Sequence, residues 1–273
     1  MEKIKRFFGD PETGTISRLE TAAGQVELTA GGTEIGNWLG FCNQKELKGV
    51  QADIQEIDVS CEPDEVATRY VVDLPEATFQ VCVSERLENG AWLRRASAIA
   101  LRPSWMGDFV LRLGVKSTDF QTAGHGKRRS RHRNRNTYHQ SHIDTVEIMG
   151  DRLLLRTTQR SDLESGRLER VSYWRDQRDG QWIQHHRLIV GEDDFDQVVF
   201  RVRNSVIDSR GSPWLRNRIF RAPFWAFNEN VLSHLRFRVL PTIQAQGVVC
   251  VAEGDTFELE SRVTVESLGE ANG

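Results

Sequence analysis

Apolar and polar residues alternate along much of the chain from about residue 50 onward. In the segment Thr256–Glu266, for example, Phe257, Leu259 and Val263 fall on one side and Glu258 falls on the other. A two-residue period is typical of β-strands that have one buried and one solvated face. The same alternation recurs at residues 197–205 and 234–240. The pattern therefore predicts a protein built mainly of antiparallel strands.

Short turn signals separate the alternating runs. Asn89-Gly90 lies between two such runs and is a preferred sequence for a two-residue hairpin, in which both central residues need positive φ. Similar turns are expected at Gly150-Asp151, Asp179-Gly180 and Gly254-Asp255. Four hairpins in succession predict a meander. One or two short helices are also expected, the best placed beginning at Pro223.

These elements predict an all-β fold, an antiparallel meander that closes into a β-barrel of calycin-like architecture. A two-sheet β-sandwich is the alternative, which the scarcity of long crossover segments disfavours. With 273 residues and no Pro/Gly/Ser-rich linker, we expect one domain over residues 1–273, in which residues 1–45 form an N-terminal lid or extension.

Composition excludes several classes of protein. Hydrophobic residues make up 38% and charged residues 27% of the chain, and no apolar run approaches the roughly 20 residues that span a bilayer. The N-terminus turns polar after Phe8, so a secretory signal is not expected and we predict a cytoplasmic protein. The four cysteines form no C-x-x-C pair and are expected to be reduced and structural.

Positive charge is concentrated in one segment, Gly124–His142, which holds six Lys or Arg, four His and no acid. The whole chain carries −3, so the rest carries −9. Runs of like charge are commonly solvated loops, and we expect a mobile loop here or a rim that attracts an acidic ligand. Nucleic acid is a less suitable partner, because only Tyr138 is available to stack on bases.

The end of this segment resumes the alternation, and a strand from Thr137 to Ile148 is expected. It would place Tyr138, Gln140, His142 and Asp144 on one side, at the mouth of the barrel. We expect Tyr138, His142 and Asp144 to transfer protons, and Gln140 and Arg135 to contact a ligand. The alternative is that these polar groups only satisfy one another at a strand end.

A second polar group lies in the segment WIQHHRLIV. On a strand, Trp182, Gln184 and His186 share a face with Leu188, so His186 rather than His185 is expected to face the cavity. His186 is a candidate general acid or base, with Trp182 and Gln184 as ligand contacts. A hydrogen-bonded structural histidine is the alternative.

Trp225 belongs to an aromatic cluster between residues 214 and 227 that would either plug the barrel or form a wall for a ligand. No metal site is expected, since His139 and His142 would lie on opposite faces of a strand. No nucleotide-binding or serine-hydrolase motif is present, so no cofactor is expected.

The sequence thus predicts an intracellular protein that binds a small hydrophobic metabolite in its pocket. An isomerase, cyclase or lyase is favoured, with substrate shape and a few pocket-mouth groups doing the chemistry. A non-catalytic ligand carrier is one alternative. A module that binds a polyanion or another protein through residues 127–135 is the other. The oligomeric state is left open.

Overall fold

The computed structural model describes residues 3–37, 40–134, 137–141, 144–160, 162, 168–177, 179–190 and 249–268. For Arg128 and residues 137–141 it describes the backbone alone. Nearly all of the regular structure in these residues is β-strand, and one short 3-10 helix, η1, spans Gln44–Glu46. The predicted strands at 197–205 and 234–240, the predicted helix at Pro223 and Trp225 lie outside the described residues.

The first sheet has ten strands in the described part of the chain. Its main path runs in the order β1 (Ile4–Gly9), β2 (Ile16–Thr21), β3 (Gly24–Ala30), β12 (Asp108–Lys116), β19 (Gln181–Val190), β18 (Leu168–Gln177) and β15 (Thr137–Ser141). A short branch of three further strands begins at β12: β4 (Thr33–Gly36), β5 (Phe41–Asn43) and β6 (Lys48–Val50). The segment expected as a lid or extension, residues 1–45, contributes β1 to β5 to this sheet.

The second sheet has nine strands in the described part of the chain. Their order is β14 (Arg128–Arg131), β13 (Thr122–His125), β16 (Thr145–Met149), β17 (Leu153–Gln159), β21 (Thr256–Ser267), β10 (Ala91–Ala100), β9 (Ala77–Glu88), β8 (Glu65–Leu74) and β7 (Asp53–Glu62). A separate pair joins β11 (Ser104–Met106) to β20 (Val249–Val251).

Three of the four predicted hairpins are confirmed. Asn89 and Gly90 have φ values of 52° and 77° between β9 and β10, and Gly180 has a φ of 77° between β18 and β19. Gly150 lies between the paired strands β16 and β17. The hairpin at Gly254 is wrong, because β20 pairs with β11 and β21 inserts between β10 and β17. A turn does occur there, but Gly254 and Asp255 exchange backbone hydrogen bonds with Ala100, and the strands on either side of the turn do not pair with each other.

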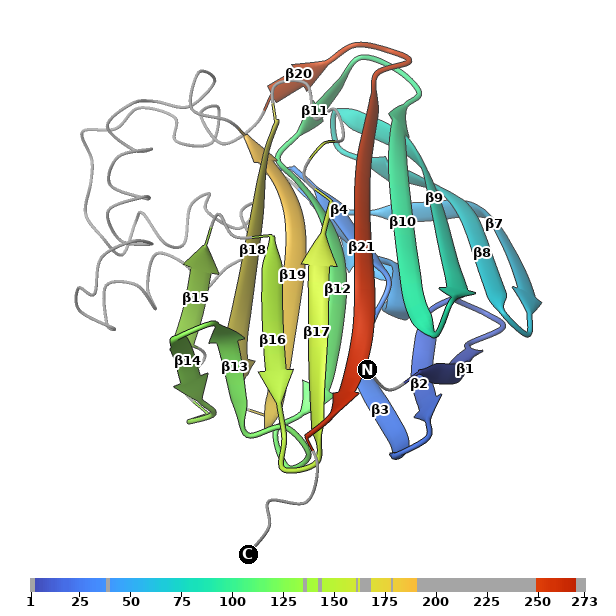
Figure 1. Ribbon diagram of the computed structural model, residues 1–273. Coiled ribbons are helices and arrows are strands. Elements are labelled where there is room, and N and C mark those ends of the chain that lie inside the picture. Colours follow the sequence, from blue (N-terminus) through green and yellow to red (C-terminus); the bar gives the residue numbers. More distant parts are fainter. Residues whose placement is uncertain are drawn as a thin grey trace, which may run out of the picture.

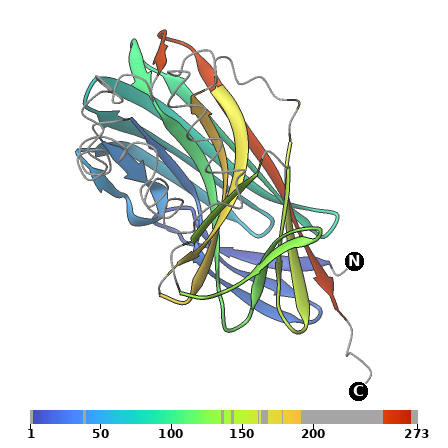
Figure 2. The same ribbon diagram turned by 90° about the vertical axis from the view of Figure 1, so that its left-hand side faces the viewer.

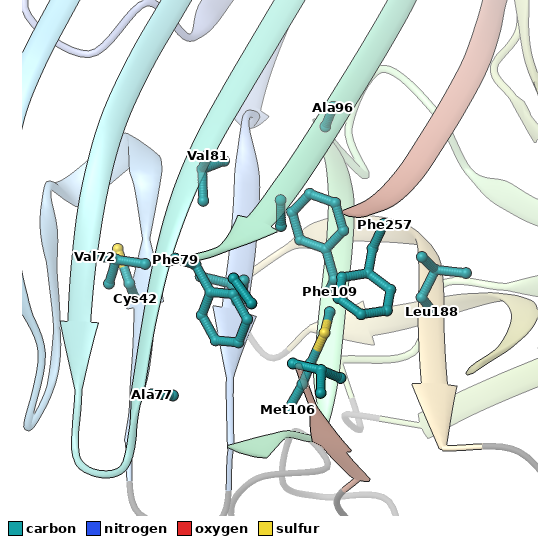
Figure 3. Packing of buried hydrophobic residues seen from close by; sticks show 14 of the residues in the cluster. Cys42, Val72, Ala77, Phe79, Val81, Ala96, Met106, Phe109, Leu188 and Phe257 are labelled. Carbon is teal, nitrogen blue, oxygen red and sulfur yellow. The ribbon is translucent and has the colours of Figure 1, made fainter. Parts of the chain in front are cut away.

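The hydrophobic core lies between the two sheets. In β21 the predicted apolar face is buried, with Phe257, Leu259 and Val263 at most 5% exposed. Phe257 and Leu259 belong to one cluster with residues of the other sheet such as Phe109 and Leu188, and Figure 3 shows this region with Phe79 and Met106. Val263 belongs to a second cluster, which holds Leu113 and Trp182 of the other sheet. Burial of alternate side chains from both sheets is what the two-residue period requires.

The predicted all-β, antiparallel fold class is confirmed, and its strands are arranged as two facing, curled sheets. Figures 1 and 2 show β12, β18 and β19 side by side and bent along their length. Each sheet has an inner face, which packs on the other sheet, and an outer face. The distinction between the two faces decides where the chemistry can lie.

Candidate functional site

The single strand predicted from Thr137 to Ile148 is wrong, because two strands in different sheets occupy this stretch. β15 pairs with β18 in the first sheet, whereas β16 pairs with β13 and β17 in the second. Tyr138 and Gln140 are therefore separated from Val146 and Ile148, which are buried in the core. Each strand alternates, so the sequence pattern alone does not reveal the change of sheet.

Asp144 is exposed and lies where β16 begins, in a different sheet from Tyr138 and Gln140. Its carbonyl oxygen accepts a hydrogen bond from the backbone N–H of Gln159 at 2.7 Å. The predicted row of Tyr138, Gln140, His142 and Asp144 is therefore not one face of one strand. His142, Arg135 and Trp225 lie outside the described residues, so their predicted roles stay predictions.

The basic segment is not the loop that its charge predicted, at least over Arg128–Arg131. These residues form β14, which pairs in register with β13. Arg129 extends to Glu147 on β16, with Nη2 2.5 Å from Oε2. His132 lies edge-on to Trp182 with ring centroids 5.0 Å apart. The positive charges of Arg128–Arg131 are therefore carried by a paired strand of the β13–β14 hairpin rather than by a loop.

β19 is buried on both faces. Trp182, Gln184 and His186 share the inner face, as predicted, and lie between the two sheets. The indole N–H of Trp182 donates to the carbonyl of Phe120 at 3.0 Å. Neither polar atom of the Gln184 side chain has a hydrogen-bond partner among the described residues.

His186 lies in the interior between the sheets, and its Nδ1 is 2.8 Å from the hydroxyl of Ser172. Burial, together with the positive charge of Arg94, lowers the pKa of His186 to about 3. The imidazole is therefore neutral at ordinary pH. Its proposed catalytic role stays a prediction, and its surroundings equally suit the structural alternative.

A buried ion pair, which was not predicted from the sequence, lies in the interior on the second sheet. The Arg94 Nε is 3.1 Å from a Glu85 carboxylate oxygen, and both side chains are 1% exposed. The Trp92 indole donates to the same carboxylate at 2.7 Å, and Arg94 also donates to the carbonyl of Arg112 at 2.8 Å. The signal in the sequence was Arg94 standing in the apolar face shared by Trp92 and Ala96.

The outer face of β19 carries a second group of buried polar side chains. His185 is 3% exposed, and neither ring nitrogen has a hydrogen-bond partner among the described residues. Its ring lies against Tyr173 of β18, with centroids 4.3 Å apart. Burial, then the charges of Arg112 and Arg187, lower its pKa well below the usual value. His185 is thus a neutral imidazole whose two nitrogens have no hydrogen-bond partner in the part of the chain that the structure describes.

Two ion pairs flank His185 on this face. Arg112, the cross-strand partner of His185, lies 2.7 Å from Glu34, and these side chains are 12% and 11% exposed. Arg187 pairs through two nitrogens with Asp108, where the side-chain exposures are 9% and 4%. The cluster is thus slightly open at Glu34 and closed at Asp108.

The carboxyl of Asp108 has an unusual proton affinity for an aspartate. Burial raises its pKa to about 6, although the positive charge of Arg187 opposes that rise. The guanidinium of Arg187 also lies over the ring of Tyr173, 4.9 Å from its centroid. A carboxyl that exchanges its proton near neutral pH and a neutral imidazole therefore occupy the same face.

We call this group the polar face. Its members are Glu34, Asp108, Arg112, Tyr173, His185 and Arg187. The sequence pattern indicated a cavity on the other side of β19, the side of His186. The β15–β18–β19 register nevertheless places Gln140, one of the predicted ligand contacts, in the cross-strand row of Tyr173 and His185.

Neither a metal centre nor a membrane-spanning helix is found in the described part of the chain. No three His, Cys, Asp or Glu side chains there could together hold a metal ion. No helix there is long and apolar enough to cross a membrane.

No model of a known protein family matches this chain, and no curated protein matches it. Solved structures with a similar fold include a candidate aldose 1-epimerase from Escherichia coli K12. It is 8% identical, with a TM-score of 0.48 over 98% of this chain and 100% of that chain. A galactose mutarotase related enzyme from Lactobacillus acidophilus is 8% identical, with a TM-score of 0.47 over 98% of both chains. At such low identities and TM-scores, the chemistry of this chain has to be inferred from its own side chains.

Proposed function

We propose that this protein is an enzyme that isomerises a small polar molecule by proton transfer at the polar face. One observation carries the proposal: His185 is buried, neutral and without a hydrogen-bond partner among the described residues. Buried polar atoms are nearly always hydrogen-bonded, so an orphaned imidazole needs a reason. A substrate hydroxyl or carbonyl group would supply the missing partner.

Asp108 adds a second proton-transfer group. A pKa of about 6 leaves its carboxyl able to give or take a proton near neutral pH. The neutral imidazole can accept a proton at one nitrogen while donating from the other. Two groups of different proton affinity on one face are what an acid–base isomerisation needs.

The composition of the polar face favours a polar substrate over the hydrophobic metabolite expected from the sequence. Arg112 and Arg187 hold planar donors in fixed positions, and Glu34 and Asp108 supply acceptors. Such groups orient hydroxyl-rich molecules by directed hydrogen bonds. Glu34 and Arg112, the more exposed pair, would form the entrance.

Aldoses are suitable first compounds for the test, because ring opening and closing of an aldose needs a general base and a general acid. Exchange between the two anomeric protons is measured by NMR for a panel of aldoses with and without the protein. His185→Asn and His186→Asn form a matched pair, since the two residues are neighbours on opposite faces of β19. We expect His185→Asn to lower kcat by about 100-fold or more and His186→Asn to retain most of it.

Two results would contradict this assignment. One is an active protein in which His186→Asn abolishes turnover while His185→Asn does not. The other is a protein that accelerates exchange of none of the aldoses.

The deep burial of His185 and Asp108, both 3% exposed, favours a ligand carrier as the second candidate. A carrier would show ligand-induced thermal stabilisation that is lost in His185→Asn, without turnover.

A further inference from the structure

The two edge strands of the nine-stranded sheet carry opposite charge. β14 and β7 lie at opposite ends of the strand order, and Figure 1 shows them on opposite sides of the molecule. Among the described residues each is paired on one side only, β14 with β13 and β7 with β8. Half of the backbone N–H and C=O groups of an edge strand are left open to another strand.

The edge at β7 is acidic. Asp53, Glu56, Asp58 and Glu62 give it four negative charges, and it has no Lys or Arg. No residue of β7 is buried, and none of these four acids has an ion-pair partner among the described residues. Most surface carboxylates on this sheet are instead paired with arginines, as in Arg86–Glu65 at 2.9 Å.

The edge at β14 is basic. The segment Lys127–Arg131 holds Lys127, Arg128, Arg129 and Arg131, four positive charges without an acid. Lys127 and Arg131 are exposed, and neither has an ion-pair partner in the part of the chain that the structure describes. Arg129 is partly neutralised by Glu147.

Charged edge strands normally prevent sheets from joining, since like charges repel. Two β14 edges, or two β7 edges, would meet with four like charges each. A β14 edge and a β7 edge would instead meet with complementary charge. The lengths are also similar, because the irregularity at Glu56, with φ 54°, divides β7 into Asp53–Gln55 and Asp58–Glu62. The second run is close in length to the four residues of β14.

We propose that copies of this protein associate head to tail, β14 of one copy adding to β7 of the next. The two surfaces differ, so the contact does not close on itself as a symmetric dimer does, and further copies can add. Four or five paired residues bury much less than the roughly 1,200 Å² of a stable interface. The association is therefore weak, reversible and strengthened by low ionic strength.

Sedimentation velocity over a concentration series tests this. At low salt the weight-average mass should rise above the monomer mass of 31.2 kDa with increasing concentration. Raising the salt to about 0.5 M, where the Debye length falls to a few ångströms, should return it to that of the monomer. A chain that stays monomeric at low salt throughout the series would overturn the proposal.

Three variants locate the contact. Lys127→Glu with Arg131→Glu brings the β14 edge from +4 to zero, and Asp58→Lys with Glu62→Lys brings β7 from −4 to zero. Each variant alone should stay monomeric. The control variant Glu27→Lys with Glu253→Lys makes the same charge change as the β7 variant at exposed sites away from both edges. It should associate like the wild type.

An equimolar mixture of the two edge variants is the decisive sample. Each retains the edge that the other has lost, so the mixture should form 1:1 dimers and nothing larger. Far-UV circular dichroism of each variant verifies that it is folded. A mixture that remains monomeric, a mixture that forms larger species, or a control variant that loses association would each overturn the head-to-tail arrangement.

Discussion

Protonation of His186 should make the protein less stable as the pH falls. Its ring lies between the sheets, where it forms a hydrogen bond with Ser172. Burial and the nearby charge of Arg94 lower its pKa to about 3. In the unfolded chain the same group titrates near about 6.5. A depressed folded-state pKa means that the unfolded state binds the proton first. The stability contributed above about pH 6.5 is therefore lost as the pH falls from there toward 3.

The size of the effect follows from these two pKa values. Between pH 7 and pH 5 the unfolded imidazole becomes almost fully protonated while the folded one stays neutral. The linkage relation then gives a loss of about 2 kcal/mol in the free energy of unfolding from His186 alone. His185, whose pKa is also depressed, acts in the same direction.

Urea unfolding of the wild type and of His186→Asn at pH 7 and pH 5 measures this contribution. Asparagine can keep the hydrogen bond to Ser172 but has no proton to gain. The variant will be less stable at both pH values because it fills less of the core. Its stability should nevertheless fall by about 2 kcal/mol less than that of the wild type between the two pH values. Equal losses in both proteins would refute the assignment of a depressed pKa to His186.

Three further variants probe other parts of the structure. Burial raises the pKa of Asp108 to about 6, so protonation of this carboxyl stabilises the folded wild type as the pH falls. Between pH 7 and pH 5, Asp108→Asn should therefore lose about 1 kcal/mol more stability than the wild type. Equal changes in the two proteins would contradict the raised pKa. Arg94→Met leaves the carboxylate of Glu85 buried without its ion-pair partner and should lower the free energy of unfolding in urea by about 3–5 kcal/mol. Adding Glu85→Gln should recover much of that loss. A double variant that recovers nothing would argue against the Arg94–Glu85 ion pair. Gly14 and Gly126 both have positive φ, 67° and 51°, but a methyl group at Gly14 would meet the hydroxyl of Thr68 whereas one at Gly126 would point into open space. Gly14→Ala should therefore lower the thermal midpoint more than Gly126→Ala. Equal shifts would show that backbone strain alone sets the cost.

The buried face of one strand and the position of one hairpin were predictable because their signals are local. Alternation in β21 gave its buried face, and the Asn89-Gly90 turn gave the hairpin between β9 and β10. Both follow from backbone geometry within a few residues. The hairpin at Gly254 failed for the complementary reason, since β21 finds its partners β10 and β17 far away in the sequence.

The candidate site shows the same boundary. The sequence correctly placed His185 and His186 on opposite faces of one strand, because that depends on strand geometry alone. It did not show which face would hold the paired charges. Arg112 and Asp108 come from β12 and Glu34 from β4, and only the long-range register brings them beside β19.

The sequence by itself thus determined the all-β class, the buried side of β21 and three of the four proposed hairpins, since each is fixed by neighbouring residues. Only the tertiary structure decided which strands pair, that β15 and β16 belong to different sheets, and that His185 lies among buried ion pairs. The physical reason is that pairing and charge burial depend on contacts between distant segments. Such contacts leave no periodic trace in the order of the residues.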